Sequence, residues 1–309
     1  MPDKPAAEVT IDAALVRHLV VTQAGTEIAD AATLPLTKTA EGWDCEVWRL
    51  GASAAVRLPR RALAAPLIVH EQRVLPLLAP GIEARGVRVP APIFAGAPDE
   101  RFPWPWSIVP WIEGAPGLGI RRSERLGWAQ PLADALGALH VAAPADYPPN
   151  PFRGVPLIER SEAVAQRLDD LRGRGAIDRR QADATASVWG LGLAAAAWSH
   201  RPVWIHGDLH PGNLVADGGR LTGIIDFGDV TAGDPAYDLA VAWLAFDDAG
   251  RARFIDATGS RYDDATWVRA HAWAAAVAMM LLTHSDDEPA YAALGREALA
   301  EVTAAALSA

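Results

Sequence analysis

The sequence predicts an α+β protein of two lobes, with a small antiparallel sheet in the N-terminal lobe and a mainly helical C-terminal lobe. The chain has 309 residues, enough for two lobes, and 50% of them are hydrophobic, so a large core can be buried. Short β-like runs gather in the first third, whereas an Ala-rich, helix-like composition begins near Arg121. We therefore expect an N-terminal lobe over residues 1–112 and a C-terminal lobe over residues 113–309.

The elements predicted for the N-terminal lobe are a helix, three short strands, a second helix and two more strands. They cover, in order, residues 11–23, 34–39, 46–50, 54–58, 62–78, 87–95 and 106–109. Gly42 and Gly51 separate the first three strands, and Pro66 and Pro76 bound the second helix. Residues 110–114 are predicted to link the two lobes.

The C-terminal lobe is predicted to be built mainly from helices. These cover, in order, residues 131–142, 157–171, 179–199, 237–246, 265–283 and 288–306. The segment 144–156 is predicted to be a loop, because it carries five prolines in thirteen positions. His140, near the end of the first helix, is expected to be a packing or capping residue.

The net charge of −10 is concentrated in the C-terminal third. Residues 201–309 hold 16 acidic and 7 basic side chains, a net of −9, which leaves −1 for the first 200 residues. The chain therefore lacks the basic patch that nucleic-acid binding requires. The acidic C-terminal part allows a cationic partner, and an ordinary solubilising surface is the equal alternative.

The single cysteine, Cys45, excludes an internal disulfide framework and fits a reducing compartment, where we expect a structural thiol. The first ten residues contain no apolar segment typical of a signal peptide. The sequence also contains no run of roughly 18 apolar residues, the length that a membrane span needs. We therefore expect a cytoplasmic protein with no membrane partner; the sequence does not indicate the oligomeric state.

The chemistry is concentrated in residues 203–240. Residues 206–209, HGDL, follow an apolar run, and Asn213 lies five positions after Asp208. This is the spacing of the H-R-D-L-x-x-x-N catalytic loop of protein kinases. Residues 226–228 then read DFG, directly after two isoleucines. A lone DFG is often chance, but the two motifs in this order are specific.

These residue types suit phosphoryl transfer, in which catalysis consists of aiming the acceptor hydroxyl and neutralising charge on the phosphates. Asp208 is predicted to accept the hydroxyl proton. Asn213 and Asp226 offer the oxygen atoms that Mg²⁺ prefers. The apolar runs around Asn213 predict short strands that place both oxygen ligands at one end of a hairpin.

An alternative interpretation is a metal-hydrolase cluster. His206, Asp208 and His210 alternate along the chain, and alternate residues of a strand share one face. This interpretation leaves Asn213 and the DFG segment unexplained.

The motifs resemble those of the aminoglycoside phosphotransferase family, which includes macrolide phosphotransferases and has a protein-kinase-like fold. In that family Gly takes the place of the kinase Arg, as Gly207 does here, and His-Pro follows the loop, as at residues 210–211. The segment GDPAYDLA at residues 233–240 is a third shared feature. The similarity is strongest over residues 198–245. It implies Mg²⁺-dependent transfer of the γ-phosphate of ATP or GTP to a hydroxyl of a small molecule.

The resemblance also assigns residues of the N-terminal lobe. Arg57 takes the place of the kinase Lys, in an apolar strand where a charge needs a partner, and is implied to touch the nucleotide phosphates. Glu71 is the one acidic residue of the second predicted helix and the candidate partner; a solvated helix face is the alternative. The turn at Gly42 is implied to cover the phosphates, and an ordinary hairpin is the equal alternative.

In kinase-like folds the linker binds the purine ring. Trp111 and Ile112 are the candidate residues, and since Pro110 has no N–H, Ile112 is the expected donor. The tryptophans at positions 104, 106 and 111 could stack on a base, although packing in the lobe core is favoured.

Three residues of the C-terminal lobe receive supporting roles. Asp238 is expected to be buried and to brace the backbone of the catalytic loop, which His206 also supports. Asp229, directly after the DFG segment, is predicted either to hold a substrate amine or to cap a turn.

The resulting prediction is a small-molecule kinase of the antibiotic kinase family. An aminoglycoside acceptor is favoured, followed by a macrolide and then by a choline-like metabolite. A catalytically idle, kinase-like binding protein is the alternative from another class. The presence of Asp208, Asn213 and Asp226 together argues against it, because an idle site does not need all three.

Overall fold

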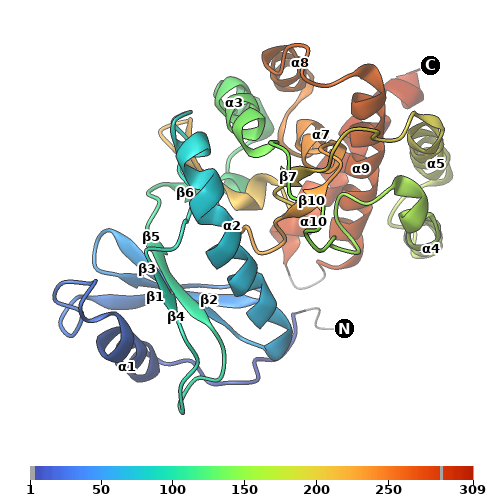
Figure 1. Cartoon of the computed structure of the whole chain (residues 1–309). Helices are drawn as coiled ribbons and strands as arrows, with labels where there is room; N and C mark the ends of the chain where they lie inside the picture. The colour runs from blue at the N-terminus through green and yellow to red at the C-terminus, as the bar shows by residue number, and fades with distance from the viewer. Residues whose placement is uncertain (1–3, 286–287, 309) are drawn as a thin grey trace.

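The computed structural model describes residues 4–285 and 288–308 of the chain. A five-stranded antiparallel sheet forms most of the N-terminal lobe, and a larger, mainly helical lobe follows (Figure 1). This is the two-lobe α+β architecture that the sequence predicts.

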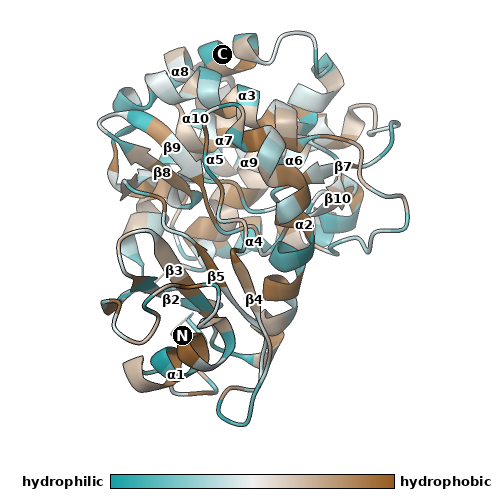
Figure 2. Cartoon of the chain, turned by 60° about the vertical axis from the view of Figure 1, so that its left-hand side comes forward, coloured by the Kyte–Doolittle hydropathy of each residue, from teal (hydrophilic) through white to brown (hydrophobic). Residues whose placement is uncertain are grey.

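The sheet has the strand order β1-β2-β3-β5-β4. Its strands are β1 (Leu36–Glu41), β2 (Cys45–Leu50), β3 (Ala54–Pro59), β4 (Phe94–Gly96) and β5 (Trp106–Pro110). The central strand β3 is buried along its whole length. Helix α1 (Ala13–Ala24) packs on the sheet in one hydrophobic cluster, and Figure 2 shows hydrophobic residues along β4 and β5.

The fourth strand is shorter than the prediction of residues 87–95. Pro90 and Pro92 interrupt this segment, and proline has no N–H to donate to a strand ladder. Arg88 instead forms an isolated parallel bridge with Gly223 of the C-terminal lobe, donating its backbone N–H to Thr222 at 2.9 Å. The segment therefore ties the lobes together before the chain enters β4.

Helix α2 (Ala65–Glu83) runs through two internal prolines, Pro76 and Pro80, although the sequence prediction ended it at residue 78. A proline inside a helix costs about 3 kcal/mol or more. Buried side chains beyond the first proline, such as Leu78 and Ile82, join the larger hydrophobic core and offset that cost. The helix therefore runs from the sheet into contact with the helical lobe (Figure 1).

The helical lobe contains short 3₁₀ segments and eight α-helices among the described residues. The helices are α3 (Ala129–Leu139), α4 (Ser161–Gly173), α5 (Arg179–Ala194), α6 (Ala236–Leu239), α7 (Val241–Ala245), α8 (Asp248–Ala257), α9 (Asp264–Thr283) and α10 (Pro289–Ser308). Helix α8 was not predicted, because its sequence is largely polar and only Gly250 and Phe254 are buried. The segment 144–156 is a loop, as predicted.

Helix α9 is the centre of the lobe, and α4, α5, α6 and α10 pack around it. In the part of the chain that the structure describes, it is also the one helix long and apolar enough to span a membrane. Two thirds of it, 67%, are buried inside the protein, as is typical of a core helix.

The hydrophobic clusters do not separate at residue 112. The smaller cluster joins α1 to the sheet, whereas the C-terminal half of α2 packs with the helical lobe. The boundary at residue 112 stays a prediction.

Two small sheets lie between the helices and carry the motif residues. β7 (Val203–Ile205) pairs with β10 (Thr231–Gly233), and β6 (Ala115–Pro116), β8 (Leu214–Asp217) and β9 (Arg220–Ile224) form the other sheet. The two motifs identified in the sequence therefore start and end at strands of these sheets.

Candidate active site

The β8–β9 hairpin brings Asn213 and Asp226 to the same end. Leu214 faces Ile224 across the hairpin, so Asn213 stands just before one strand and Asp226 just after the other. The Ile225 N–H donates to the Asn213 carbonyl at 2.9 Å and closes this end. The predicted placement of both side chains at one end of a hairpin is confirmed.

The catalytic loop needs a glycine at position 207. Gly207 has a φ of +83°, and a Cβ there would lie 2.5 Å from the carbonyl oxygen of Asp229. A side chain would meet both a strained backbone and a collision. The replacement of the kinase Arg by Gly207 thus has a steric reason in this chain.

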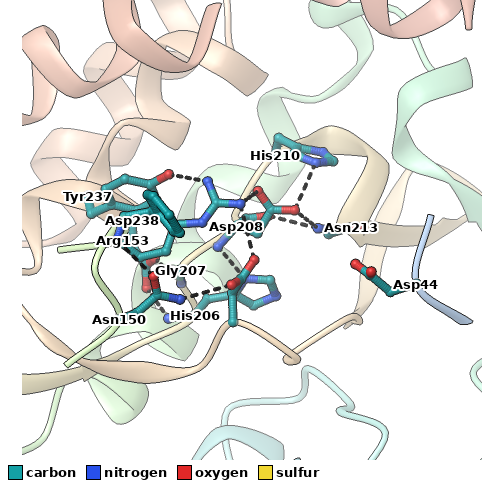
Figure 3. Close-up of polar contacts among 12 residues, drawn as sticks. Asp44, Asn150, Arg153, His206, Gly207, Asp208, His210, Asn213, Tyr237 and Asp238 are labelled. Atoms are coloured by element: carbon teal, nitrogen blue, oxygen red, sulfur yellow. Dashed lines mark hydrogen bonds and ion pairs between the residues drawn. The ribbon is translucent and has the colours of Figure 1, made fainter. Parts of the chain in front are cut away.

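The Asp238 side chain is fully buried beneath the loop. Its carboxylate accepts the backbone N–H groups of His206 at 2.7 Å and Gly207 at 3.0 Å (Figure 3). His140, the C-cap of α3, contacts the same carboxylate at 3.1 Å and Tyr262 at 2.7 Å. Asp238 therefore braces the loop backbone, and His140 is the capping and packing residue that the sequence predicts.

Both ring nitrogens of His206 are engaged. Nδ1 accepts the Asp208 N–H at 3.1 Å, and Nε2 donates to the Ile225 carbonyl at 2.9 Å. The ring also packs on Phe227, with centroids 4.5 Å apart. No nitrogen of His206 is left to bind a metal, and residues 4–285 and 288–308 hold no cluster of three His, Cys, Asp or Glu suited to one. The metal-hydrolase interpretation is therefore wrong.

The Asp208 carboxylate is about one quarter exposed and is surrounded by donors. Asn213 donates from its amide to the Asp208 carbonyl at 2.7 Å and to Oδ2 at 3.3 Å. Arg153 lies 3.3 Å from Oδ1 and His210 lies 3.5 Å from Oδ2 (Figure 3). Burial alone would raise the pKa of Asp208, but Arg153 and His210 more than offset it and hold the pKa below its usual range. The carboxylate is therefore ionised near neutral pH.

Arg57 lies between two carboxylates on the other side of the site. Its Nη2 is 2.9 Å from Glu71 Oε1 and 3.1 Å from Asp226 Oδ1. Glu71 is 1% exposed, so the predicted ion pair is present and the solvated alternative is wrong. Burial would lower the pKa of Arg57, but the two carboxylates raise it, so the guanidinium stays charged.

Asn213 and Asp226 fit a magnesium site. Both side-chain contacts of Asn213 use the amide nitrogen, and no described residue donates to its Oδ1. The Asp226 side chain is 55% exposed and is held through Oδ1 alone. Asp226 also has a φ of +64°, which is uncommon outside glycine and occurs often at functional sites. Two hard oxygen atoms are thus free at one end of the hairpin.

The site lies within the part of the chain that matches a known family. The sequence pattern of the phosphotransferase enzyme family matches residues 36–273. The chain belongs to this family. The match spans both lobes of the chain and includes every site residue described above.

Solved phosphotransferases share its fold. The GDP complex of wild-type aminoglycoside 2'-phosphotransferase-IIIa is 19% identical, with a TM-score of 0.68, over 96% of this chain and 100% of that one. The macrolide 2'-phosphotransferase MphH from Brachybacterium faecium is 20% identical, with a TM-score of 0.59, over 94% and 97%. These similarities establish the protein-kinase-like fold, as the sequence predicts.

A curated relative is the uncharacterized protein YcbJ of Bacillus subtilis, which is 26% identical over 196 residues. That alignment spans 54% of this chain and 58% of YcbJ, little more than half of each.

The linker between the lobes retains one backbone donor. The Trp111 N–H donates to Ser53 at 2.8 Å, and the Arg49 guanidinium lies 4.6 Å from the Trp111 ring centroid. No described residue accepts the Ile112 N–H, and its role as the donor to a purine ring stays a prediction. Trp106 is fully buried and Trp104 packs against the smaller hydrophobic cluster, so both belong to the lobe core.

The turn at Gly42 has the geometry of an ordinary hairpin. Its N–H donates to the Cys45 carbonyl at 2.8 Å, and its carbonyl accepts from Arg60 at 3.1 Å. Both backbone groups are engaged within the N-terminal lobe, so Gly42 offers no free N–H to a phosphate. Cys45 is buried, and burial raises the pKa of its thiol, in keeping with the structural role expected.

Arg153 is a site residue that the sequence prediction missed. It comes from the proline-rich loop and donates to the Tyr237 hydroxyl at 2.6 Å and to Asp229 Oδ2 at 3.1 Å (Figure 3). Asn150 of the same loop donates to Asp229 Oδ1 at 3.0 Å. Asp229 is therefore paired with Arg153 within the chain, and its predicted hold on a substrate amine stays a prediction.

The loop that carries Arg153 is fixed on the β7–β10 sheet. The Gly154 carbonyl accepts the Asp234 N–H at 3.0 Å, and the Asn150 N–H donates to the Thr231 hydroxyl at 3.1 Å. A Cβ on Gly154, which has a φ of +63°, would lie 2.5 Å from Ile205. The one available signal in the sequence was Arg153 itself, the single basic residue of this proline-rich loop.

Proposed function

We propose that this protein transfers the γ-phosphoryl group of a nucleotide to a hydroxyl of a small molecule. The observation that carries the proposal is the convergence of Asp208, Asn213 and Asp226 at one end of the β8–β9 hairpin, opposite the Arg57–Glu71 pair. Family membership supports the same reaction class.

Asp208 acts on the acceptor hydroxyl in this proposal. The hydroxyl oxygen forms a bond to the γ-phosphorus, the bond from that phosphorus to its bridging oxygen breaks, and the nucleoside diphosphate leaves with the electron pair. The hydroxyl proton passes to Asp208. The lowered pKa of Asp208 makes it a weak base, so its main contribution is to orient the hydroxyl and to receive the proton late.

Asn213 Oδ1 and the Asp226 carboxylate would hold Mg²⁺, which supplies neutralisation of charge on the phosphates when bound. We assign Arg57 to the same phosphates, since it is charged, buried and fixed by Glu71. The Ile112 N–H is the proposed donor to the purine ring. Solved relatives contain GDP or ADP, and the preference of this chain for ATP or GTP is part of the test below.

The narrower acceptor predictions are an aminoglycoside, a macrolide or a choline-like metabolite. The acidic C-terminal third supports a cationic acceptor, and the solved relatives include a kanamycin complex and macrolide phosphotransferases. At 19–20% identity, similarity to these relatives establishes the fold of this chain but does not identify its substrate. A cytoplasmic location belongs to the same proposal and is supported by the single buried thiol.

The test is acceptor-dependent release of nucleoside diphosphate, measured with ATP and GTP in parallel against a panel of aminoglycosides, macrolides, amino alcohols and hydroxylated acids. We expect turnover with at least one acceptor, and its loss in Asp208→Asn. Nucleotide binding without acceptor-dependent turnover, or equal turnover in the variant, would instead identify a catalytically idle binding protein.

A further inference from the structure

A hollow of ≈ 220 Å³ lies beside the proposed catalytic carboxylate. Arg153 and Asp229 belong both to the lining of this hollow and to the surroundings of Asp208. In Figure 3 the Arg153 side chain lies between Tyr237 and Asp208. A molecule in the hollow would therefore lie next to the residue proposed to orient its hydroxyl.

The lining of the hollow is positively charged. It contains three arginines, Arg153, Arg160 and Arg167, and a single acidic residue, Asp229. Arg153 is balanced by Asp208 and Asp229, which lie 3.3 and 3.1 Å from it. Arg160 and Arg167 are therefore the source of the excess positive charge in the lining.

Arg160 and Arg167 have no carboxylate partner among residues 4–285 and 288–308, and both are half-buried. They lie seven residues apart, about two helical turns: Arg160 is the N-cap of α4, Arg167 lies in the middle of that helix, and both line the hollow. Burial and the nearby charge of Arg160 lower the pKa of Arg167 by more than Tyr237 and Asp170 raise it. Their forked guanidinium groups match the oxygen pair of a carboxylate or phosphate.

The rest of the lining is apolar. Tyr237 and Trp273 contribute aromatic faces 4.8 Å apart between centroids, and Val277 and Met280 of α9 contribute aliphatic surface. The volume is below the range of roughly 300–1,000 Å³ typical of pockets for drug-sized ligands. The hollow thus suits a small apolar body with one charged end, and it is too small for a macrolide ring.

We propose that this hollow binds the acceptor, and that the acceptor is a small hydroxylated molecule with an apolar body and one oxyanion group held by Arg160 and Arg167. The inference rests on the proposed phosphoryl transfer and narrows its substrate class. It departs from the expected aminoglycoside, because a polycation would meet the two unpaired arginines. The acidic excess of the C-terminal third includes charges at Asp247, Asp248 and Asp264 that lie outside the lining of the hollow.

The test compares probes that share a ring and a hydroxymethyl group and differ in the charged or neutral group opposite it; the carboxylate and the amide match most closely in shape. 4-(Hydroxymethyl)benzoate, its neutral amide, 4-(hydroxymethyl)benzylammonium and 4-(hydroxymethyl)phenyl phosphate are titrated into the full chain by calorimetry without nucleotide. We expect the benzoate or the phosphate to bind at least roughly tenfold more tightly than the cation, the size of effect that a charged hydrogen bond supplies. The two anions together show whether the preferred oxyanion is a carboxylate or a phosphate.

Arg160→Gln and Arg167→Gln should each reduce this preference several-fold. Arg174→Gln, an exposed arginine at the end of the same helix and outside the lining, is the matched control and should keep the wild-type preference. Tighter or equal binding of the cation in the wild type, no binding of either anion at millimolar concentration, or a preference unchanged in both variants overturns the proposal.

Nucleotide turnover with the same probes separates this inference from the proposed reaction. Anion binding that depends on Arg160 and Arg167 supports the hollow even if no probe is phosphorylated, a result that would count against the reaction alone. Asp208-dependent turnover of the cation with no anion binding leaves the reaction standing and rejects the hollow.

Discussion

Two arginines of this protein, Arg57 and Arg153, lie in similar surroundings on opposite sides of the site. Each contacts two carboxylates, Glu71 and Asp226 in one case and Asp208 and Asp229 in the other. Both guanidinium groups are largely buried, and burial also raises the pKa of one carboxyl beside each, Glu71 to about 7 and Asp229 above its usual range.

The difference lies in what surrounds these charges. On the nucleotide side the Asp226 side chain is 55% exposed, so its charge faces the space where a metal and phosphates are proposed to bind. On the acceptor side the Asp229 side chain is 27% exposed and paired with Arg153, and Arg160 and Arg167 add two positive charges to the lining of the hollow. We therefore expect the nucleotide side to favour a cation and the acceptor side to favour an anion.

Asp208→Asn should have the largest effect. The variant keeps the shape of the side chain but cannot receive a proton, so kcat should fall by at least ~10²-fold while nucleotide affinity and Tm change little. Steady-state turnover, nucleotide titration and thermal melting measure the three quantities. A variant with half the wild-type turnover would remove Asp208 from the mechanism.

Asp226→Ala tests the nucleotide side. Nucleotide affinity is measured with and without Mg²⁺. The factor by which Mg²⁺ tightens nucleotide binding should fall about tenfold or more, because the carboxylate proposed to hold the ion is gone. Asp217→Ala, at the exposed end of β8, is the control and should keep that dependence. Equal tightening by Mg²⁺ in Asp226→Ala and the wild type would show that the ligand lies elsewhere.

Tyr237→Phe tests how Arg153 is held. It removes the hydroxyl that accepts the 2.6 Å bond from this buried guanidinium, so the free energy of unfolding should fall by about 1–3 kcal/mol. Tyr147→Phe is the control, since no described residue bonds to the Tyr147 hydroxyl. Equal stability of the two variants in urea denaturation would contradict the role given to Tyr237.

The smallest expected effect is on the pH profile. A depressed pKa keeps Asp208 ionised until the pH falls below the ordinary aspartate value of about 4, so the acidic limb of kcat/KM that belongs to Asp208 should lie below that pH. Any change between pH ~6 and 8 should instead come from Glu71, whose pKa burial raises to about 7. Arg153→Gln removes the positive charge that offsets the effect of burial on the pKa of Asp208. That pKa should rise, and the acidic limb of the kcat/KM profile should move to higher pH by roughly one unit or more. Arg201→Gln, an exposed arginine, should leave the limb in place. A downward shift in Arg153→Gln would contradict the assignment.

The residues on the nucleotide side of the site could be predicted from the sequence, whereas Arg153 on the acceptor side could not. Asp208 and Asn213 are five residues apart, and a hairpin of apolar strands fixes Asp226 beside them, so short-range spacing carries the information. Arg57 and Glu71 also lie close in sequence, on adjacent elements.

Arg153 reaches its partners across 76 and 84 residues, through a loop without regular structure. No periodicity encodes that contact, and only the packing of the loop on β10 creates it. The same limit explains α2, where tertiary burial of Ile82 outweighs the helix-breaking preference of Pro80.

The two hydrogen bonds from backbone N–H groups to Asp238 should slow hydrogen exchange in the loop. Loop amides usually exchange their hydrogens with solvent quickly, because local openings expose them. The N–H groups of His206 and Gly207 end on a carboxylate that is wholly enclosed and tied to α3 through His140. Exposing them requires the helical lobe itself to open. These two loop amides should therefore exchange as slowly as those of the core helices, at the rate set by global unfolding.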